Sequence, residues 1–429
     1  MRIRYFLPVV LLTFLFSVSA FAESSIKAKE LARRAASENQ TEAVSAINQL
    51  RAMREEGLEA LFEIYAADIR RFNETAEGGG DWKRIAFAID SVAMQKDAYA
   101  SRLFWYTDLE QAVLAAKSRN KPILSLRLLG NLNEEFSCAN SRLFRALLYS
   151  NAEISKFLRE NYVLHWKSVR PAPRVTIDFG DGRKIERTLT GNSIHYLLDD
   201  SGAILDALPG LYSPQGFLKY LAQAEKVNKT IDGASAAAKE TARLRFRRLM
   251  FNDLVAKRNK AVTDAKVKLT EPKNSTAAID VQPRAVSKAM VTGEISILRG
   301  ISDDFSRYEP QINFDDWNRF AQIYTGGTKI DAGSEAFIRR QNAKTGLSEA
   351  EFTNLIEKLE KYIALDTARN DFLFHPKLYE WLNRQIVTDV EQFNARVYAE
   401  IFKTPDSDKW LGMYAPDIYT ALDGGGIIK

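Results

Sequence analysis

Hydrophobic positions recur at two different periods along the chain, and the change of period divides the sequence. Between residues 26 and 74, apolar side chains such as Val44, Ile47 and Leu50 return every three or four positions. This spacing predicts amphipathic helices, the first of them capped by Thr41. Two more helices are expected, from Gly57 to Ile69 and from Trp82 to about Arg102. The pattern predicts a helical N-terminal subdomain over residues 23–104.

After residue 104, segments with the shorter hydrophobic period of strands appear between the helical ones. A capping box at Thr107 to Glu110 predicts a helix, and the apolar run from Ile123 to Leu129 predicts a buried strand. The following elements are expected in this order: a helix that begins at Cys138, strands over 162–166, 188–199 and 203–208, and a helix that Ser213 and Pro214 begin. Residues 105–226 therefore mix strands with helices.

A polar insertion separates two of these strands. Within it, Val175, Ile177 and Ile185 flank the dipeptide Asp181-Gly182. This dipeptide favours the tight turn of a β-hairpin. Arginines of the insertion, among them Arg170 and Arg174, are expected to be solvated loop residues rather than an anion-binding edge.

Residues 227–290 predict a basic helix and a linker. Eight basic residues lie between 239 and 260, against Glu240 and Asp253, with apolar side chains between them. A packed helix with a solvated basic face is favoured over a helix that lies on an anionic membrane surface. Residues 261–290, rich in Lys, Thr, Pro and Ala, are typical of a linker.

The helical period returns over residues 291–429. Ser348 to Glu351 form a capping box, Pro376 is placed at a helix start, and Asp389 is placed to cap a further helix. We therefore expect a helical C-terminal domain over 291–429.

The first residues follow a third pattern. Arg2 and Arg4 precede an apolar run of about a dozen residues, and small residues then end at Ala22, before Glu23. This is the pattern of a secretory signal peptide over residues 1–22. The run is shorter than the roughly 20 residues of a membrane-spanning helix. We expect cleavage between Ala22 and Glu23 and a soluble periplasmic or secreted protein.

Composition narrows the classes of function. The 429-residue chain is 46% hydrophobic, as in a packed globular protein, and carries a formal net charge of +5. This balance is too mild to indicate nucleic-acid binding, and no nucleic-acid motif accompanies it. Cys138 is the single cysteine, so the chain has no internal disulfide. We expect no cofactor.

The order of elements over residues 105–226 resembles the thioredoxin fold. Cys138 and Ser141 occupy the two positions of the family's Cys-x-x-Cys site. Three more segments are similar to the family: Lys121-Pro122-Ile123-Leu124, Glu160-Asn161-Tyr162-Val163, and Leu197 through Gly202 to Ile204. The resemblance implies an α/β thioredoxin-like central domain flanked by all-α N-terminal and C-terminal regions.

The resemblance also implies site residues. Cys138 and Ser141 take the catalytic positions, and Asn192 and Ser193 take the substrate-binding edge, because Ser193 stands where the family has its cis-proline. Since Ser141 replaces the second cysteine, an internal dithiol–disulfide cycle cannot occur in this chain.

The environment expected for the thiol is mixed. A helix N-terminus favours a reactive thiolate, whereas the neighbouring charges of Glu134 and Glu135 disfavour one.

His165 and His195 lie on predicted strands. With Cys138 they form a set of residue types that zinc and copper accept. Histidines on central strands are nevertheless favoured as hydrogen-bonded core residues, so no metal site is predicted. His375, before Pro376, is expected to be structural.

Two functions stay open. The first is an exported monothiol protein whose Cys138 engages the thiols or disulfides of an envelope client protein. The second is a non-catalytic thioredoxin-fold scaffold or binding protein of the cell envelope. Whether the chain is an enzyme depends on whether Cys138 is exposed and reactive.

Overall fold

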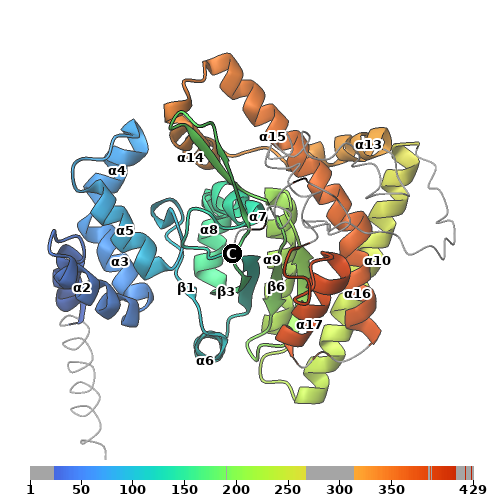
Figure 1. Cartoon of the computed structure of the whole chain (residues 1–429). Helices are drawn as coiled ribbons and strands as arrows, with labels where there is room; N and C mark the ends of the chain where they lie inside the picture. Colours follow the sequence, from blue (N-terminus) through green and yellow to red (C-terminus); the bar gives the residue numbers. More distant parts are fainter. Residues whose placement is uncertain are drawn as a thin grey trace, which may run out of the picture.

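A five-stranded mixed sheet lies in the middle of the protein, with many helices around it (Figure 1). The computed structural model describes residues 24–189, 191–266, 314–384, 387, 389–411, 421 and 427. The predicted signal peptide, the predicted linker from residue 267 onward and most of the chain after residue 411 lie outside the described residues.

The sheet joins two parallel pairs to an antiparallel hairpin. The strand order is β1-β3-β2-β6-β7, in which β1, β3 and β2 run parallel and β6 and β7 run antiparallel to their neighbours. The strands are β1 (Trp105–Tyr106), β2 (Ile123–Leu129), β3 (Val163–Arg170), β6 (Ser193–Leu198) and β7 (Ile204–Pro209). Every residue of β2 is buried, as its apolar run predicts.

The register assigns polar side chains to opposite faces of this sheet. Ser125 pairs with His165 on one side and with Tyr196 on the other, whereas Leu126 pairs with His195. Paired residues share a face and successive residues alternate between faces. His165 and Tyr196 therefore lie on one face, and His195 lies on the other.

The N-terminal helices lie beside the β1 end of the sheet (Figure 1). Arg51 holds them there by donating one hydrogen bond of 2.9 Å to the Val92 carbonyl and another to the Trp105 carbonyl. Residues 24–35 are helical, followed by α2 (Gln40–Ala52), α3 (Glu55–Ile64), α4 (Ala66–Thr75), α5 (Trp82–Ala93) and the short η1 (Ala98–Ala100).

Three details of the predicted N-terminal helices are wrong. Asn39, not Thr41, caps α2, because its side chain accepts hydrogen bonds from two backbone amides of the first turn. The helix predicted from Gly57 to Ile69 is broken at Tyr65 into α3 and α4. The helix from Trp82 ends at Ala93, where Met94 takes a left-handed conformation.

The helices of the central region are α6 (Leu109–Arg119), α7 (Ala139–Phe144), the π-helical η2 (Arg145–Tyr149), α8 (Ala152–Asn161) and α9 (Pro214–Thr230). Ser213 caps α9 ahead of Pro214, as predicted. The cap of α6 is Asp108 rather than Thr107, since the Asp108 carboxylate accepts the Gln111 amide at 2.8 Å.

The polar insertion forms the predicted hairpin. Strands β4 (Arg174–Asp178) and β5 (Lys184–Thr188) make a separate two-stranded sheet around the Asp181-Gly182 turn. The strand predicted over 188–199 is therefore two strands, because Thr188 ends β5 and Ser193 begins β6.

Most of the later helices lie on the β6 side of the sheet (Figure 1), but α14 (Ala332–Gln341) packs on η2, where Ser334 Oγ lies 3.1 Å from Ser150 Oγ. The capping box at Ser348 and the cap at Asp389 are confirmed, and α16 begins at His375, one residue before Pro376. The elements are α10 (Ala236–Asp264), α13 (Phe314–Tyr324), η4 (Thr325–Gly327), α14 (Ala332–Gln341), η5 (Ala343–Thr345), α15 (Glu349–Arg369), η6 (Asn370–Phe374), α16 (His375–Arg384), α17 (Val390–Arg396) and η7 (Val397–Ile401).

The predicted basic helix is α10. It packs on the core as expected, but not all of its basic residues are solvated. Phe246, Met250 and Leu254 enter the core, but Arg243 and Arg247 are buried too, so a wholly solvated basic face is wrong. The helix also continues to Asp264, into the segment predicted as linker.

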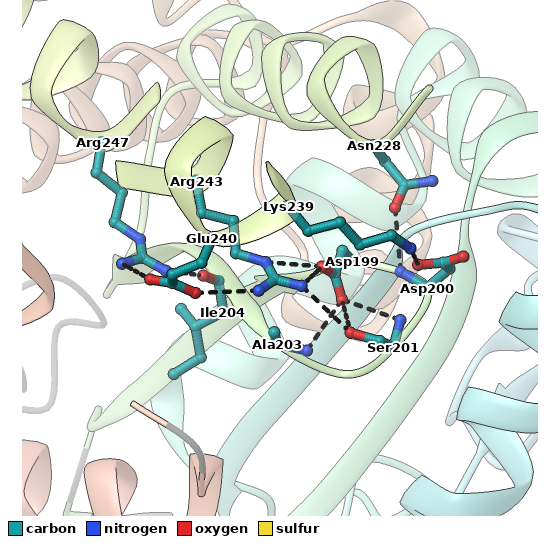
Figure 2. A network of polar contacts seen from close by, with 10 residues as sticks. All are labelled: Asp199, Asp200, Ser201, Ala203, Ile204, Asn228, Lys239, Glu240, Arg243 and Arg247. Carbon is teal, nitrogen blue, oxygen red and sulfur yellow. Dashed lines mark hydrogen bonds and ion pairs between the residues drawn. The ribbon is translucent and has the colours of Figure 1, made fainter. Parts of the chain in front are cut away.

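The two buried arginines tie α10 to the turn between β6 and β7 (Figure 2). The Asp199 carboxylate accepts the backbone amides of Ser201 and Ala203 and also the Arg243 guanidinium, whose Nε lies 2.8 Å away. Arg247 donates to the Ile204 carbonyl at 2.6 Å. Each buried charge thus has a partner, which offsets the cost of its desolvation.

Among the described residues, none of the helices has the length and apolar character needed to cross a bilayer.

Candidate site around Cys138

Cys138 lies where the central strand β2 leads, through a loop, into α7. It is the N-cap residue of that helix. Its backbone amide donates a hydrogen bond of 3.0 Å to the carbonyl of Leu129, the last residue of β2. The side chain is fully buried. The predicted helix start at Cys138 is therefore present, and the thiol points into the protein rather than toward solvent.

Three of the predicted site residues come together here. The Cys138 sulfur lies 3.5 Å from Ser141 Oγ and 3.4 Å from Ser193 Oγ. The Ser141 hydroxyl also lies 2.7 Å from Ser137 Oγ and from the Cys138 carbonyl oxygen. Cys138, Ser141 and Ser193 have no exposed surface. Their catalytic and substrate-binding roles stay predictions.

Asn192, the fourth predicted site residue, is covered by the end of the C-terminal helices. Its side-chain amide donates to Thr404 Oγ1 at 3.2 Å, and its carbonyl accepts the Tyr398 hydroxyl at 3.2 Å. We call residues 397–408, formed by η7 and the chain after it, the C-terminal cover. Asn192 is fully buried beneath it.

Arg170, at the end of β3, fixes the C-terminal cover to the sheet. Its guanidinium donates to the carbonyl oxygens of Thr404, Pro405 and Asp408 at 2.6, 3.3 and 3.1 Å. Burial, with a further contribution from Cys138, holds the pKa of Tyr398 well above its ordinary value. Tyr398 is thus a neutral hydrogen-bond donor within the cover. The prediction that Arg170 is a solvated loop residue is therefore wrong, because its guanidinium holds the C-terminal cover in place.

His195 lies on the same face of the sheet as Ser193 and is a core residue, as predicted. Its Nε2 lies 2.7 Å from the Tyr149 hydroxyl, and the rings of Phe144 and Phe217 lie 4.5 and 5.0 Å from its own. Burial lowers the pKa of His195 to about 3, so the imidazole is neutral.

His165 lies on the opposite face. Its Nδ1 lies 2.7 Å from Ser125 Oγ, and burial, together with the charge of Arg127, lowers its pKa to about 2. Because the sheet separates it from Cys138 and His195, the three residues cannot converge on one metal ion. In the part of the chain that the structure describes, no group of three or more His, Cys, Asp or Glu residues is placed to hold a metal.

The sequence analysis missed a buried charge beside His165. Arg127, in the middle of β2, is fully buried and donates to Ser125 Oγ and to Glu391 Oε1 of α17, both at 2.7 Å. Lys167 also pairs with Glu391, at 3.4 Å. A lone arginine within the apolar run from Ile123 to Leu129 was the sequence signal, since a charge there requires a buried partner.

A second buried polar cluster was also missed. The Asp206 carboxylate on β7 lies 2.8 Å from His375 Nε2 and accepts the Tyr379 hydroxyl at 2.8 Å. The Tyr212 hydroxyl lies 3.1 Å from His375 Nδ1. All four side chains are buried and each is hydrogen-bonded, so this cluster holds α16 against the sheet. The expected structural role of His375 fits this arrangement.

The arrangement around Cys138 therefore joins a thiol to two hydroxyls in a closed interior. A thiol exchanges with a disulfide only if its sulfur can reach the other sulfur, and here the sulfur is fully buried. Comparison of the chain with protein-family models, with curated proteins and with solved structures gave no match.

Proposed function

We propose that this chain is a non-catalytic, thioredoxin-like binding protein of the cell envelope, in which Cys138 is a structural residue. The proposal joins a fold, a location and a role, and each rests on a separate observation. No cofactor enters the proposal.

The thioredoxin-like fold is supported by the topology. Helix, strand, helix and strand produce the parallel pair β2–β3, and an antiparallel hairpin, β6–β7, then extends the sheet beyond β2. The cysteine follows the central strand at a helix start, and Ser193 lies beside it from β6. These are the relations that the resemblance over residues 105–226 implies.

The absence of thiol chemistry is supported by one observation above all, the complete burial of Cys138. The edge that would receive a client beside the sulfur is taken by Tyr398 and Thr404 through Asn192. A client therefore has to bind elsewhere on the surface, as in a scaffold.

The rate of alkylation of Cys138 tests this role. The measurement uses iodoacetamide at a pH near 8.5, which is about the pKa of a free cysteine thiol. Cys138 of the native protein should react at least ~100-fold more slowly than Cys138 of the protein unfolded in guanidinium chloride, because reaction in the native protein requires local opening. A native rate within about threefold of the unfolded rate would contradict the proposal and support monothiol exchange instead.

Two variants make the measurement specific. Cys138→Ala combined with Ser118→Cys moves the single thiol to an exposed position of α6, and this control should react at the rate of a free cysteine. Arg170→Met removes the three contacts that hold residues 404–408, so it should speed the alkylation of Cys138 several-fold if the cover is the barrier.

The proposed location rests on the N-terminal sequence pattern. Expression with residues 1–22 present should yield an envelope fraction in which mass spectrometry finds an N-terminus at Glu23. An intact chain that begins at Met1 and stays in the cytoplasm would overturn the location without affecting the proposed role of Cys138.

A further inference from the structure

The β4–β5 hairpin is a separate element that stands apart from the central sheet, as the dark green ribbon in Figure 1 shows. Its base is anchored close to the Cys138 loop. Arg142 donates to Thr188 Oγ1 at 2.8 Å, and the Arg174 guanidinium lies 4.6 Å from the centre of the Phe136 ring. The hairpin is thus fixed to the rest of the described residues at its base.

The two faces of the hairpin differ in chemistry. One face carries the ion pairs Arg174–Glu186, at 3.3 Å, and Lys184–Asp178, at 2.8 Å. The other face carries apolar side chains and an arginine, because Val175 pairs directly with Arg187, and Ile177 with Ile185. Phe179 and Arg183 continue this face toward the turn.

The apolar face has no partner in the described part of the chain. Ile185 is 36% exposed and Phe179 is 51% exposed, and neither these two nor Val175 and Ile177 belong to the hydrophobic cores of the described residues. A two-stranded ribbon is marginally stable in water unless its apolar face packs on something. The face is therefore an interaction surface.

We propose that this surface binds the same surface of a second copy of the chain, in an antiparallel, two-fold arrangement. A two-fold interface requires a surface whose two ends complement each other. In this hairpin, Arg187 lies at the base, whereas the Phe179 ring and the ion pair between Arg183 and the Asp181 carboxylate lie at the turn. Antiparallel packing brings each Arg187 to the partner copy's turn.

The centre and the ends of the surface both fit this arrangement. Ile177 and Ile185 form the middle of the face, about 7 Å from Arg187, so in a two-fold pair they meet their own copies. Among the described residues, Arg187 has no carboxylate partner and donates to the Glu186 carbonyl. A carboxylate accepts more than one arginine, so Asp181 is able to bind Arg187 of the other copy while it keeps Arg183.

The small size of the surface sets its strength. Five residues on each strand bury much less than the roughly 800 Å² per partner of a standard stable interface. The dimer is therefore weak, with a dissociation constant on the order of 10–100 μM.

Sedimentation equilibrium of the mature full-length chain over about 1–1,000 μM tests the proposal. The unchanged chain should dimerise, and Ile177→Ser combined with Ile185→Ser should raise the dissociation constant by about tenfold or more. Glu186→Gln, on the ion-paired face of the same hairpin, is the matched control and should leave it unchanged. Circular dichroism confirms that each variant is folded.

Exchange of charge tests the antiparallel arrangement itself. Arg187→Glu places two acids at each contact, and Asp181→Arg leaves Arg187 facing arginines with no acid, so each variant alone should be monomeric. A mixture of the two variants restores opposite charges at both contacts and should dimerise. A monomeric unchanged chain, a dimer that is indifferent to the serine variants, or a mixture that stays monomeric would each overturn the proposal.

Discussion

The two faces of the central sheet each bury a histidine, but they do so in opposite ways. On the face that carries Ser193, His195 packs among aromatic rings, and its bond to Tyr149 is between neutral groups. On the other face, His165 lies beside the Arg127 guanidinium, which pairs with Glu391 of α17. We call these the aromatic face and the charged face.

The difference shows two ways in which helices are held against a sheet. The aromatic face is held by helices that lie near it in sequence, such as α9 through Phe217. The charged face is held by α17, which follows much later in the chain, through an ion pair with specific geometry. Packing is tolerant of small shifts, whereas a buried guanidinium requires its own acceptor.

The largest effect is expected from a cavity on the aromatic face. Phe217→Ala removes a fully buried ring and should lower the free energy of unfolding by about 3–5 kcal/mol, measured by urea denaturation. Phe87→Ala, at an exposed position of α5, is the control and should change it by less than about 0.5 kcal/mol. A similar small cost for both would mean that packing does not hold this face.

A smaller loss is expected on the charged face. Glu391→Gln leaves Arg127 buried without a carboxylate, but Glu391 is itself partly exposed, so the cost should be about 1–2 kcal/mol. Glu400→Gln, which breaks a solvent-exposed pair with Arg396, should cost under about 0.5 kcal/mol.

A double variant separates the charge from the packing on this face. Because the pair is worth little against apolar residues of similar volume, Arg127→Met with Glu391→Met should be more stable than Glu391→Gln alone. If the double variant is the less stable one, the ion pair itself stabilises the charged face.

The effect that is smallest at neutral pH is a dependence of stability on pH, to which the histidine of each face contributes. The unfolded chain protonates His195 below its ordinary pKa of 6.5, whereas the folded chain does so only near its pKa of about 3. Stability is thus fully present above pH 6.5 and declines as the pH falls toward 3, by about 1.4 kcal/mol per pH unit.

Substitution of each histidine isolates its share of this decline. Between pH 6 and 4, His195→Gln should reduce the slope of the unfolding free energy against pH by about 1.4 kcal/mol per pH unit, the contribution of one proton. His165→Gln should do the same, since the pKa of His165 is lowered to about 2. A variant whose curve keeps the slope of the unchanged protein would show that its histidine is not buried neutral.

The sequence predicted those elements whose determinants are local. The apolar run of β2, the Ser213 cap, the capping box at Ser348 and the Asp181-Gly182 turn each depend on neighbouring residues, and all four are present. Thr41 and Thr107 were wrong as caps because Asn39 and Asp108, close beside them, provide the acceptors.

The burial of the candidate site was not predictable in the same way. Tyr398 and Thr404 cover Asn192 from more than 200 positions later in the chain, and no local pattern predicts these contacts. Arg243 was expected in solvent because its acceptor, Asp199, lies 44 positions earlier in the chain. The resemblance to the thioredoxin fold implied that Cys138, Ser141 and Ser193 lie together, but long-range contacts decide what they are able to do.

The long-range contacts that residues 375–404 make with the sheet region have a consequence for the kinetics of folding. Asp206 and His375 are 169 positions apart, Asn192 and Thr404 are 212 apart, and Arg127 and Glu391 are 264 apart. Contacts of such high sequence separation form slowly, because a long loop must close before they are gained. Until residues near 404 have left the ribosome, the sheet has buried acceptors and guanidinium groups without partners. The chain should thus reach its native state only after residues near 404 have left the ribosome, and remain open to chaperones until then.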